Sequence, residues 1–192
     1  MKTGRAEGSP VLLTLYTIGH SNHSIEYLLH MLCAMELQQL VDVRAYPNST
    51  RHPQFAGMYL RRVLMDFGIS YCWAGSRLGG MHKERSASPH RAIKSPALRA
   101  YADYMETQEF RDALTELIDS AGAMRTVLMC AERDPSRCHR SLIADHLSLR
   151  GIRVMHLIDN RASRIHELNP LARRVGDDLI YDRGTTCELD LE

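Results

Sequence analysis

Five short segments of the chain consist almost entirely of apolar residues, separated by longer and more polar stretches. An uninterrupted apolar run of about 4–8 residues is typical of a strand that is covered on both faces, as the strands of a parallel sheet are. The pattern therefore predicts five buried strands. They are residues 11–18, 37–43, 69–74, 125–131 and 152–158.

Helical periodicity fills the intervals between these strands. In residues 24–35, apolar side chains return every three or four positions, and Ser24 is a suitable N-cap. Ser95 and Thr107 have the same role before two later helices. The further predicted helices are residues 55–67 ending at Gly68, 97–107 after Pro96, the segment from Thr107 to Gly122, and 138–149 ending at Gly151.

The alternation of strands and helices predicts the fold class. Strands that are joined through helices form right-handed crossovers and a parallel sheet. We therefore expect a three-layer α/β fold, with a mostly parallel sheet of about five strands and helices on both faces. The length of 192 residues favours a single domain over residues 11–192, preceded by a loose polar tail at residues 1–10.

Two stretches do not fit this alternation. Residues 81–95 are polar and long for a loop, and loops of this length are usually functional or disordered. Residues 159–192 are ambiguous, because the segment 177–182 within them suits either an edge strand or a surface segment.

Composition narrows the classes of protein to which the chain can belong. Apolar residues make up 44% and charged residues 24%, which is ordinary for a globular protein. No apolar run approaches the roughly 20 residues of a membrane helix, and the run after residue 10 is too short for a signal peptide. We therefore expect a cytoplasmic protein without a membrane partner. The formal net charge of +1 gives no global argument for nucleic-acid binding, and only a local basic surface remains open.

The cysteines divide into two groups. Five of them, an odd number, argue against a disulfide framework. Cys33 and Cys72 fall within a predicted helix and a predicted strand, and we expect both in the core. Cys187 lies in the C-terminal segment and indicates no role. Cys130 and Cys138, near the end of one strand and the start of the next helix, are the candidates for chemistry.

Ionisable residues or glycines follow four of the predicted strands. In an open parallel sheet, ligands bind beyond the carboxyl ends of the strands. Because these ends lie along one edge, we expect the residues that follow them to form one polar pocket. They are His20 and Ser21 after the first strand, Asp42 and Arg44 after the second, Gly79 and Gly80 after the third, and Glu132, Cys138, His139 and Arg140 after the fourth.

Cys138 is the strongest candidate for catalysis, because it lies at the start of a predicted helix. The helix macrodipole and the free N–H groups there favour a thiolate, and His139 and Arg140 would add positive charge. A thiolate with a lowered pKa is a nucleophile or a metal ligand. The alternative is a small apolar residue that begins a helix by chance.

Cys130 ends an apolar strand, and a core cysteine is its simpler interpretation. Alternatively, Cys130 joins Cys138 and His139 as a metal ligand, or forms a redox pair with Cys138. The spacing of the two cysteines is not that of a common zinc motif, so a metal site would need His20 or Glu132 to complete it.

The residues nearest the helix starts each have more than one possible role. His20 suits an acid–base role, a ligand role, or plain hydrogen bonding within a loop. Ser21 suits anion binding beside a helix N-terminus, or capping of that helix. Glu132 could orient Arg140, His139 or a water molecule.

The remaining pocket residues belong to the second and third strand ends. Asp42 and Arg44 share one face of an extended chain, so they either pair with each other or hold a substrate. Gly79 and Gly80 permit a close approach between backbone and ligand.

Taken together, these motifs resemble a known family. The order of short motifs is similar to that of the domain of unknown function 488 family, over residues 14–158. The motifs are Thr17-Ile18-Gly19-His20-Ser21, Asp42-Val43-Arg44, Pro47-x-Ser49, Pro53-x-Phe55, Leu78-Gly79-Gly80, Tyr101-x-x-Tyr104-Met105, Cys130-Ala131-Glu132 and Cys138-His139-Arg140. The resemblance implies an α/β fold and says little about activity. It also implies that Cys130, which lies in one of the motifs, is a site residue rather than a core residue.

The first functional hypothesis is a small-molecule enzyme. Cys138 would be the thiolate, and Arg44 and Arg140 would hold an anionic group of a nucleotide or another phosphorylated substrate. His20, His139 or Glu132 would transfer protons.

Three alternatives remain open. The first is a divalent metal site, zinc or iron, that uses Cys130, Cys138 and a histidine, either His20 or His139. The second is a nucleic-acid-binding module, suggested by the basic stretch 81–99. Arg51, Arg61 and Arg62 suggest the same module. The third is a partner-binding protein whose polar groups only brace one another.

Overall fold

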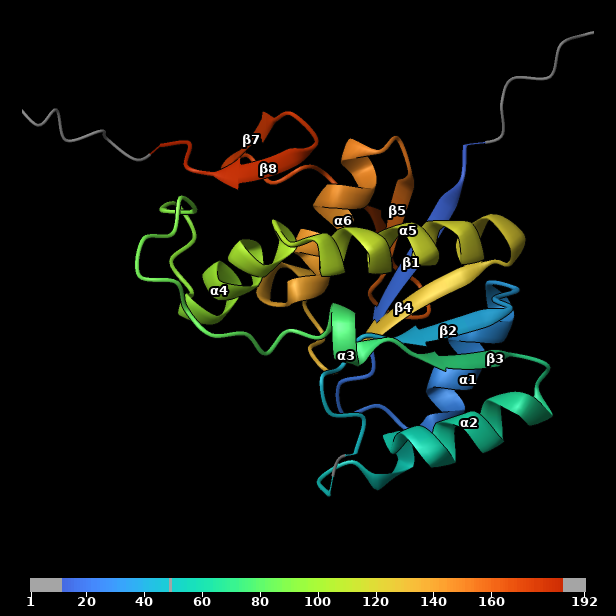
Figure 1. Cartoon of the computed structure of the whole chain (residues 1–192). Coiled ribbons are helices and arrows are strands. Elements are labelled where there is room, and N and C mark those ends of the chain that lie inside the picture. Colours follow the sequence, from blue (N-terminus) through green and yellow to red (C-terminus); the bar gives the residue numbers. More distant parts are fainter. Residues whose placement is uncertain (1–11, 49, 185–192) are drawn as a thin grey trace, which may run out of the picture.

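A six-stranded sheet forms the centre of the computed structural model, which describes residues 12–48 and 50–184 (Figure 1). The strand order is β3-β2-β4-β1-β5-β6. The first five strands are parallel, and β6 runs antiparallel to β5. The strands are β1 (Thr14–Gly19), β2 (Gln39–Asp42), β3 (Ser70–Trp73), β4 (Thr126–Cys130), β5 (Arg153–Leu157) and β6 (Ser163–Ile165). The expected tail at residues 1–10, Ser49 and Cys187 lie outside the described residues.

Helices cover both faces of this sheet, as expected for a three-layer α/β fold (Figure 1). The helices are α1 (Ile25–Ala34), α2 (Gly57–Asp66), α3 (Gly75–Leu78), α4 (Pro96–Met105), α5 (Gln108–Ala123) and α6 (His139–Leu149), with short 3-10 turns η1 (Pro53–Phe55) and η2 (Pro135–Arg137). α1 and α2 enclose one apolar core against the sheet. α4, α5 and α6 enclose the other.

The predicted N-caps form as expected. The hydroxyls of Ser24, Ser95 and Thr107 each accept a hydrogen bond from a backbone N–H in the first turn of the following helix. The predicted stops at Gly68 and Gly151 are also confirmed, since both adopt positive φ, at 70° and 76°. The predicted stop at Gly122 is wrong, because α5 continues to Ala123.

The third strand differs from its prediction. Its apolar run predicts a buried strand, but β3 lies at the edge of the sheet and most of its side chains are exposed. The prediction that Cys72 is a core residue is therefore wrong, and Cys33 is exposed as well. Cys33 lies on the outer side of α1, away from the buried residues Leu28, Leu29 and Leu32. The four described cysteines are free thiols.

The ambiguous C-terminal segment forms a hairpin outside the main sheet (Figure 1). β7 (Ala172–Val175) pairs with β8 (Asp178–Tyr181). The carboxylate of Asp145 on α6 accepts hydrogen bonds from His166 Nε2 (2.8 Å), the Asn169 amide (2.9 Å) and the Tyr181 hydroxyl (2.9 Å). One buried carboxylate thus holds the segment from β6 to β8 against α6.

The hairpin also holds the long polar loop of residues 81–95. The Tyr181 amide donates to His90 Nδ1 (3.3 Å), and the Tyr181 carbonyl accepts from the Ala92 amide (2.9 Å).

Within the described residues, no helix has the length and apolarity needed to cross a membrane.

Candidate functional site

Three potential ligand atoms meet where β4 ends and α6 begins. Cys130 is the last residue of β4, Cys138 is the N-cap of α6, and His139 is the first residue of that helix. The two sulfurs and a ring nitrogen of His139 all lie within 4.8 Å of one another, and all three residues are buried. Cys138 Sγ is 3.7 Å from His139 Nδ1. The turn η2 folds the connecting loop back, so cysteines eight positions apart become neighbours.

The orientation of His139 is fixed by the backbone of the neighbouring strand. His139 Nε2 lies 3.0 Å from the Val43 carbonyl oxygen, which can only accept, so Nε2 carries the proton and donates it. The other nitrogen, Nδ1, therefore faces the sulfurs. The Tyr101 ring packs edge-on against this imidazole, with ring centroids 4.9 Å apart.

The two thiols are unequal. The hydrogen bond from Cys138, the nearby His139 ring and the Glu132 amide together hold the pKa of Cys130 well below its usual value, despite burial. The pKa of Cys138 is raised well above its usual value, because its thiol donates to Cys130 and is buried. The geometry thus favours ionisation of Cys130 first, the reverse of the order expected from the helix position of Cys138.

Asp42 and Arg44 pair with each other. Arg44 Nε and Nη2 donate to the two carboxylate oxygens of Asp42, at 2.8 and 2.5 Å. The Asp42 carboxylate also accepts from the Tyr71 hydroxyl (2.8 Å). Arg44 further donates to the Phe55 carbonyl (2.8 Å) and to His20 Nε2 (3.2 Å). Most of its donors are therefore committed inside the protein.

His20 is buried beside this ion pair. Its Nδ1 donates to the Ser21 carbonyl (2.9 Å), while Nε2 accepts from Arg44. Burial, followed by the charge of Arg44, lowers the pKa of His20 to about 4, so the ring is neutral near pH 7. His20 is therefore an acceptor next to Arg44 rather than a cation.

Arg140 is also buried and braces the loop after β4. Its guanidinium donates to the carbonyl oxygens of Glu132 and Arg133. Its Nε has no hydrogen-bond partner, and Arg140 forms no ion pair with any described residue. The Glu132 side chain is exposed, and Glu132 contacts this arginine through its backbone carbonyl.

The glycine pair covers the site. A methyl group at position 80 would stand 2.6 Å from His139 Nδ1, so only glycine fits there without displacement. The Tyr101 and Tyr104 hydroxyls hold the preceding carbonyls of Leu78 (3.0 Å) and Arg77 (2.8 Å). The close approach at Gly80 is thus to His139, whereas the close approach at Gly79 is to the Gly75 carbonyl and Ala45.

The structure brings most of the predicted pocket together, but not all of it. His20, Asp42 and Arg44 form one group, and Cys130, Cys138, His139 and Gly80 form a second. The His20 amide joins them by donating to the Cys130 carbonyl (2.9 Å), and Arg140 braces the loop that follows Cys130. The Ser21 hydroxyl instead bonds the neighbouring Asn22 side chain (3.2 Å). Sequence reasoning missed the Val43 carbonyl, which has no residue signature, and Tyr101, whose helical spacing indicates only core packing.

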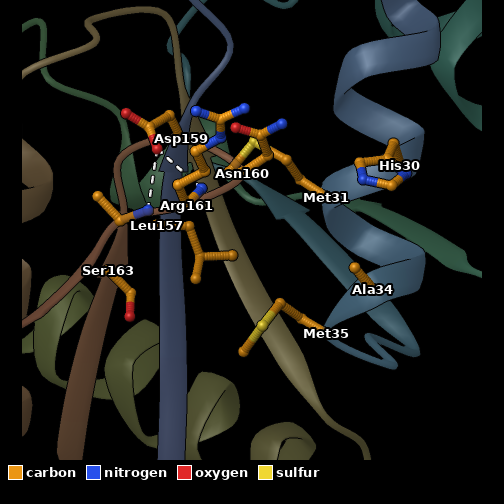
Figure 2. Close-up of a pocket in the computed structure, with 10 residues that line it drawn as sticks. His30, Met31, Ala34, Met35, Leu157, Asp159, Asn160, Arg161 and Ser163 are labelled. Carbon is orange, nitrogen blue, oxygen red and sulfur yellow. Dashed lines mark hydrogen bonds between the residues drawn. The ribbon is translucent and has the colours of Figure 1, made fainter.

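Two pockets on the surface lie away from Cys130, Cys138 and His139. Figure 2 shows one of about 240 Å³ between α1 and the turn after β5, lined by Met31, Met35, Leu157 and Asp159 among others. A second, of about 360 Å³, lies beside β6 and the His166 ring. Neither is lined by Cys130, Cys138 or His139, all three of which are buried.

This arrangement has the chemistry of a metal centre. Two thiols and an imidazole nitrogen are the donors that zinc prefers, and tetrahedral bond lengths place such donors roughly 3.5–3.8 Å apart. A family model described as Domain of unknown function DUF488 matches residues 24–147, which include Arg44, Gly80 and all three potential ligands. No curated protein and no solved structure matches the chain.

Proposed function

The chain belongs to the family described as Domain of unknown function DUF488, and from the site that this family segment contains we propose that it binds a divalent transition metal. The ligands are Cys130, Cys138 and His139, and zinc is the first candidate. The fourth coordination position is left for water or a substrate, which is the pattern of a catalytic metal. The proposed activity is therefore that of a small-molecule enzyme.

One observation carries this proposal: three donor atoms of the right kind lie within 4.8 Å of one another before any ion is bound. The 3.7 Å between Cys138 Sγ and His139 Nδ1 matches the separation expected for two ligands of one tetrahedral zinc. Soft sulfur ligands select zinc, iron or copper over magnesium or calcium.

The surroundings of the ligands support the same assignment. Metal-binding histidines commonly donate their second ring N–H to a carbonyl or carboxylate, as His139 does to Val43. Arg140 is a buried cation that forms no direct ion pair among the described residues, although the Asp134 carboxylate is within electrostatic reach. Its charge acts to lower the pKa of Cys138, and an anionic thiolate there would help to balance it.

Metal content and cobalt spectroscopy test the proposal. Protein purified without a histidine tag and without chelator should contain about one equivalent of zinc or iron. Cobalt reconstitution should give intense thiolate-to-cobalt absorption. Cys130→Ser and Cys138→Ser should lose both signals, and Cys72→Ser, at an exposed cysteine, should keep them. Less than about a tenth of an equivalent in fresh protein, with no cobalt bands, would refute the metal site.

A second candidate, a cysteine nucleophile, is favoured by the lowered pKa of Cys130. Here metal-free protein should react rapidly with iodoacetamide near pH 7, and peptide mapping should find the label on Cys130 ahead of Cys138. A rate no faster than that of Cys72 would exclude a nucleophile. If Cys130 is a nucleophile, the proposed substrate class is a nucleotide or another phosphorylated small molecule. Arg44 and Arg140, the candidate anion-binding residues, already donate most of their hydrogen bonds to acceptors within the protein.

A further inference from the structure

Four large apolar side chains are exposed on segments near the carboxyl ends of β2 and β3. Tyr46 is 73% exposed, Met58 78%, Trp73 45% and Met81 69%. They lie on four different segments: the loop after β2, the first turn of α2, the end of β3 and the loop after α3. We call these four residues the outer rim.

Hydrogen bonds and close backbone approaches bring the four segments next to one another. Trp73 Nε1 donates to the Arg44 carbonyl (2.9 Å), two residues before Tyr46. The Gly57 amide, next to Met58, donates to the Pro47 carbonyl (3.0 Å). A methyl group at Gly79, two residues before Met81, would stand 2.8 Å from Ala45 Cα. The four segments are therefore neighbours, and the one that carries Met81 continues directly from Gly80, which lies against His139.

The charged side chains of these segments are all basic. Residues 43–65 contain four arginines and no aspartate or glutamate, and residues 74–83 contain Arg77 and Lys83 and again no acid. Arg44 pairs with Asp42, and Arg77 pairs with Glu116. Arg51, Arg61 and Lys83 are exposed, and none of them forms an ion pair within the described part of the chain.

The basic stretch 81–99 contributes less than its sequence suggests. Arg85 pairs with Glu106 (3.1 Å), and Arg99 lies 3.8 Å from Glu84. Arg91 and Lys94 stay exposed and form no ion pair among the described residues. Two cations of this loop are thus neutralised by nearby carboxylates, whereas Lys83, two residues after Met81, is not.

We propose that the outer rim, together with Arg51, Arg61 and Lys83, binds single-stranded nucleic acid. Exposed tyrosine and tryptophan rings stack on unpaired bases, and arginine and lysine neutralise the phosphates between them. A duplex keeps its bases stacked internally and offers no faces to these rings. An acidic peptide would use the cations and leave the aromatic residues without a role. This surface does not depend on a bound metal, so it goes beyond the function proposed above.

The only tryptophan of the chain, Trp73, reports directly on this surface. The experiment uses full-length protein in EDTA, a labelled oligothymidylate of about 12 nucleotides, and a duplex of the same length. Binding of the single strand should quench Trp73 fluorescence and raise the anisotropy of the label. The affinity should fall steeply as salt is raised.

Two substitutions separate stacking from charge. Tyr46→Ala should weaken binding by about tenfold with an unchanged salt dependence, because a stacked base is lost. Arg51→Gln should reduce the slope of log affinity against log salt by about 0.7. Phe67→Ala, an exposed aromatic at the opposite end of α2, and Arg174→Gln on β7 are the matched controls and should change neither quantity.

The outcomes decide the proposal. No quenching and no anisotropy change at low salt would overturn it, and so would equal affinity for the duplex. Binding that Tyr46→Ala leaves intact would indicate a general polyanion surface and would overturn it too. Because both assays are performed without metal, their failure is separate from failure of the metal site. Circular dichroism verifies that each variant is folded.

Discussion

The Cα atom of Gly80 lies directly against the imidazole of His139, close enough that a methyl group at position 80 would stand 2.6 Å from Nδ1. Nδ1 is the nitrogen that faces the two sulfurs, because Nε2 is held by the Val43 carbonyl. The absence of a side chain at one position thus lets the proposed ligand sit where it does.

Gly80→Ala should therefore weaken metal binding while leaving the fold intact. The new methyl group must push the imidazole away, and displacing a ligand by loss of its support commonly costs 10–100-fold in affinity. We expect at least about a tenfold loss in cobalt titrations. Gly122→Ala is the control, since nothing lies within 4 Å of a methyl group there. This second variant lies inside α5 and should gain up to about 1 kcal/mol of stability.

Asp42→Asn should destabilise the protein strongly. Asp42 is fully buried and binds Arg44 through both oxygens, so the variant leaves a buried guanidinium without its counter-charge. Breaking such a pair costs about 3–5 kcal/mol, measurable by urea unfolding at pH 7. Tyr71→Phe removes only one hydroxyl donor to the same carboxylate and should cost about 1 kcal/mol. Similar losses for the two variants would contradict the role given to the ion pair.

Stability should decrease in mild acid because of His156. Burial, then the charges of His166, Arg140 and Arg164, lower its pKa to about 3, and Asp134 only partly opposes them. In the unfolded chain His156 binds a proton below about pH 6.5, whereas in the folded protein it binds one only below about pH 3. This one residue should therefore reduce the free energy of unfolding by about 1.4 kcal/mol for each pH unit between pH 6 and 4.

His156→Gln should remove that part of the pH dependence. Urea unfolding at several pH values would then show a shallower decline than in the parent protein. His30→Gln, at an exposed position on α1, should leave the decline unchanged. An unaltered slope in the first variant would mean that His156 is protonated in the folded protein.

Asp145→Asn should release the C-terminal segment. Three donors, from His166, Asn169 and Tyr181, converge on this carboxylate. An amide cannot accept from all three, and we expect a loss of about 2–4 kcal/mol. Hydrogen exchange should become faster in residues 166–181 and stay slow in β2 and β4. Tyr181→Phe should show a weaker form of the same effect, and uniform acceleration across the sheet would argue against a local role.

Much of the fold could be predicted because local rules act on contiguous residues. The apolar runs locate five strands of the sheet within a few residues, and the hydroxyls of Ser24, Ser95 and Thr107 mark three helix starts. The exposure of β3 could not be predicted, because an apolar run looks the same at the edge of a sheet as at its centre. Whether a strand lies at the edge or at the centre depends on which strands pair with it, and not on its own sequence.

The site was predictable as a set of residues but not as a geometry. Strand ends bring Cys130, His20 and Arg44 to one edge, and this follows from the parallel topology. The inequality of Cys130 and Cys138 does not follow, because it depends on which thiol donates to the other. The hydrogen bonds from Arg140 to backbone carbonyls could not be predicted from the sequence either, because every residue has a carbonyl.

The sheet order has a consequence for where the protein can be cut. β1 lies between β4 and β5, yet the matched family segment, 24–147, starts after β1 has ended and stops before β5 begins. A fragment with those boundaries would lose the strand that supplies one side of the β4 hydrogen bonds, leaving that edge open to association with other molecules. We therefore expect the matched segment of this chain not to fold on its own, and fragments meant for expression need boundaries drawn from the topology.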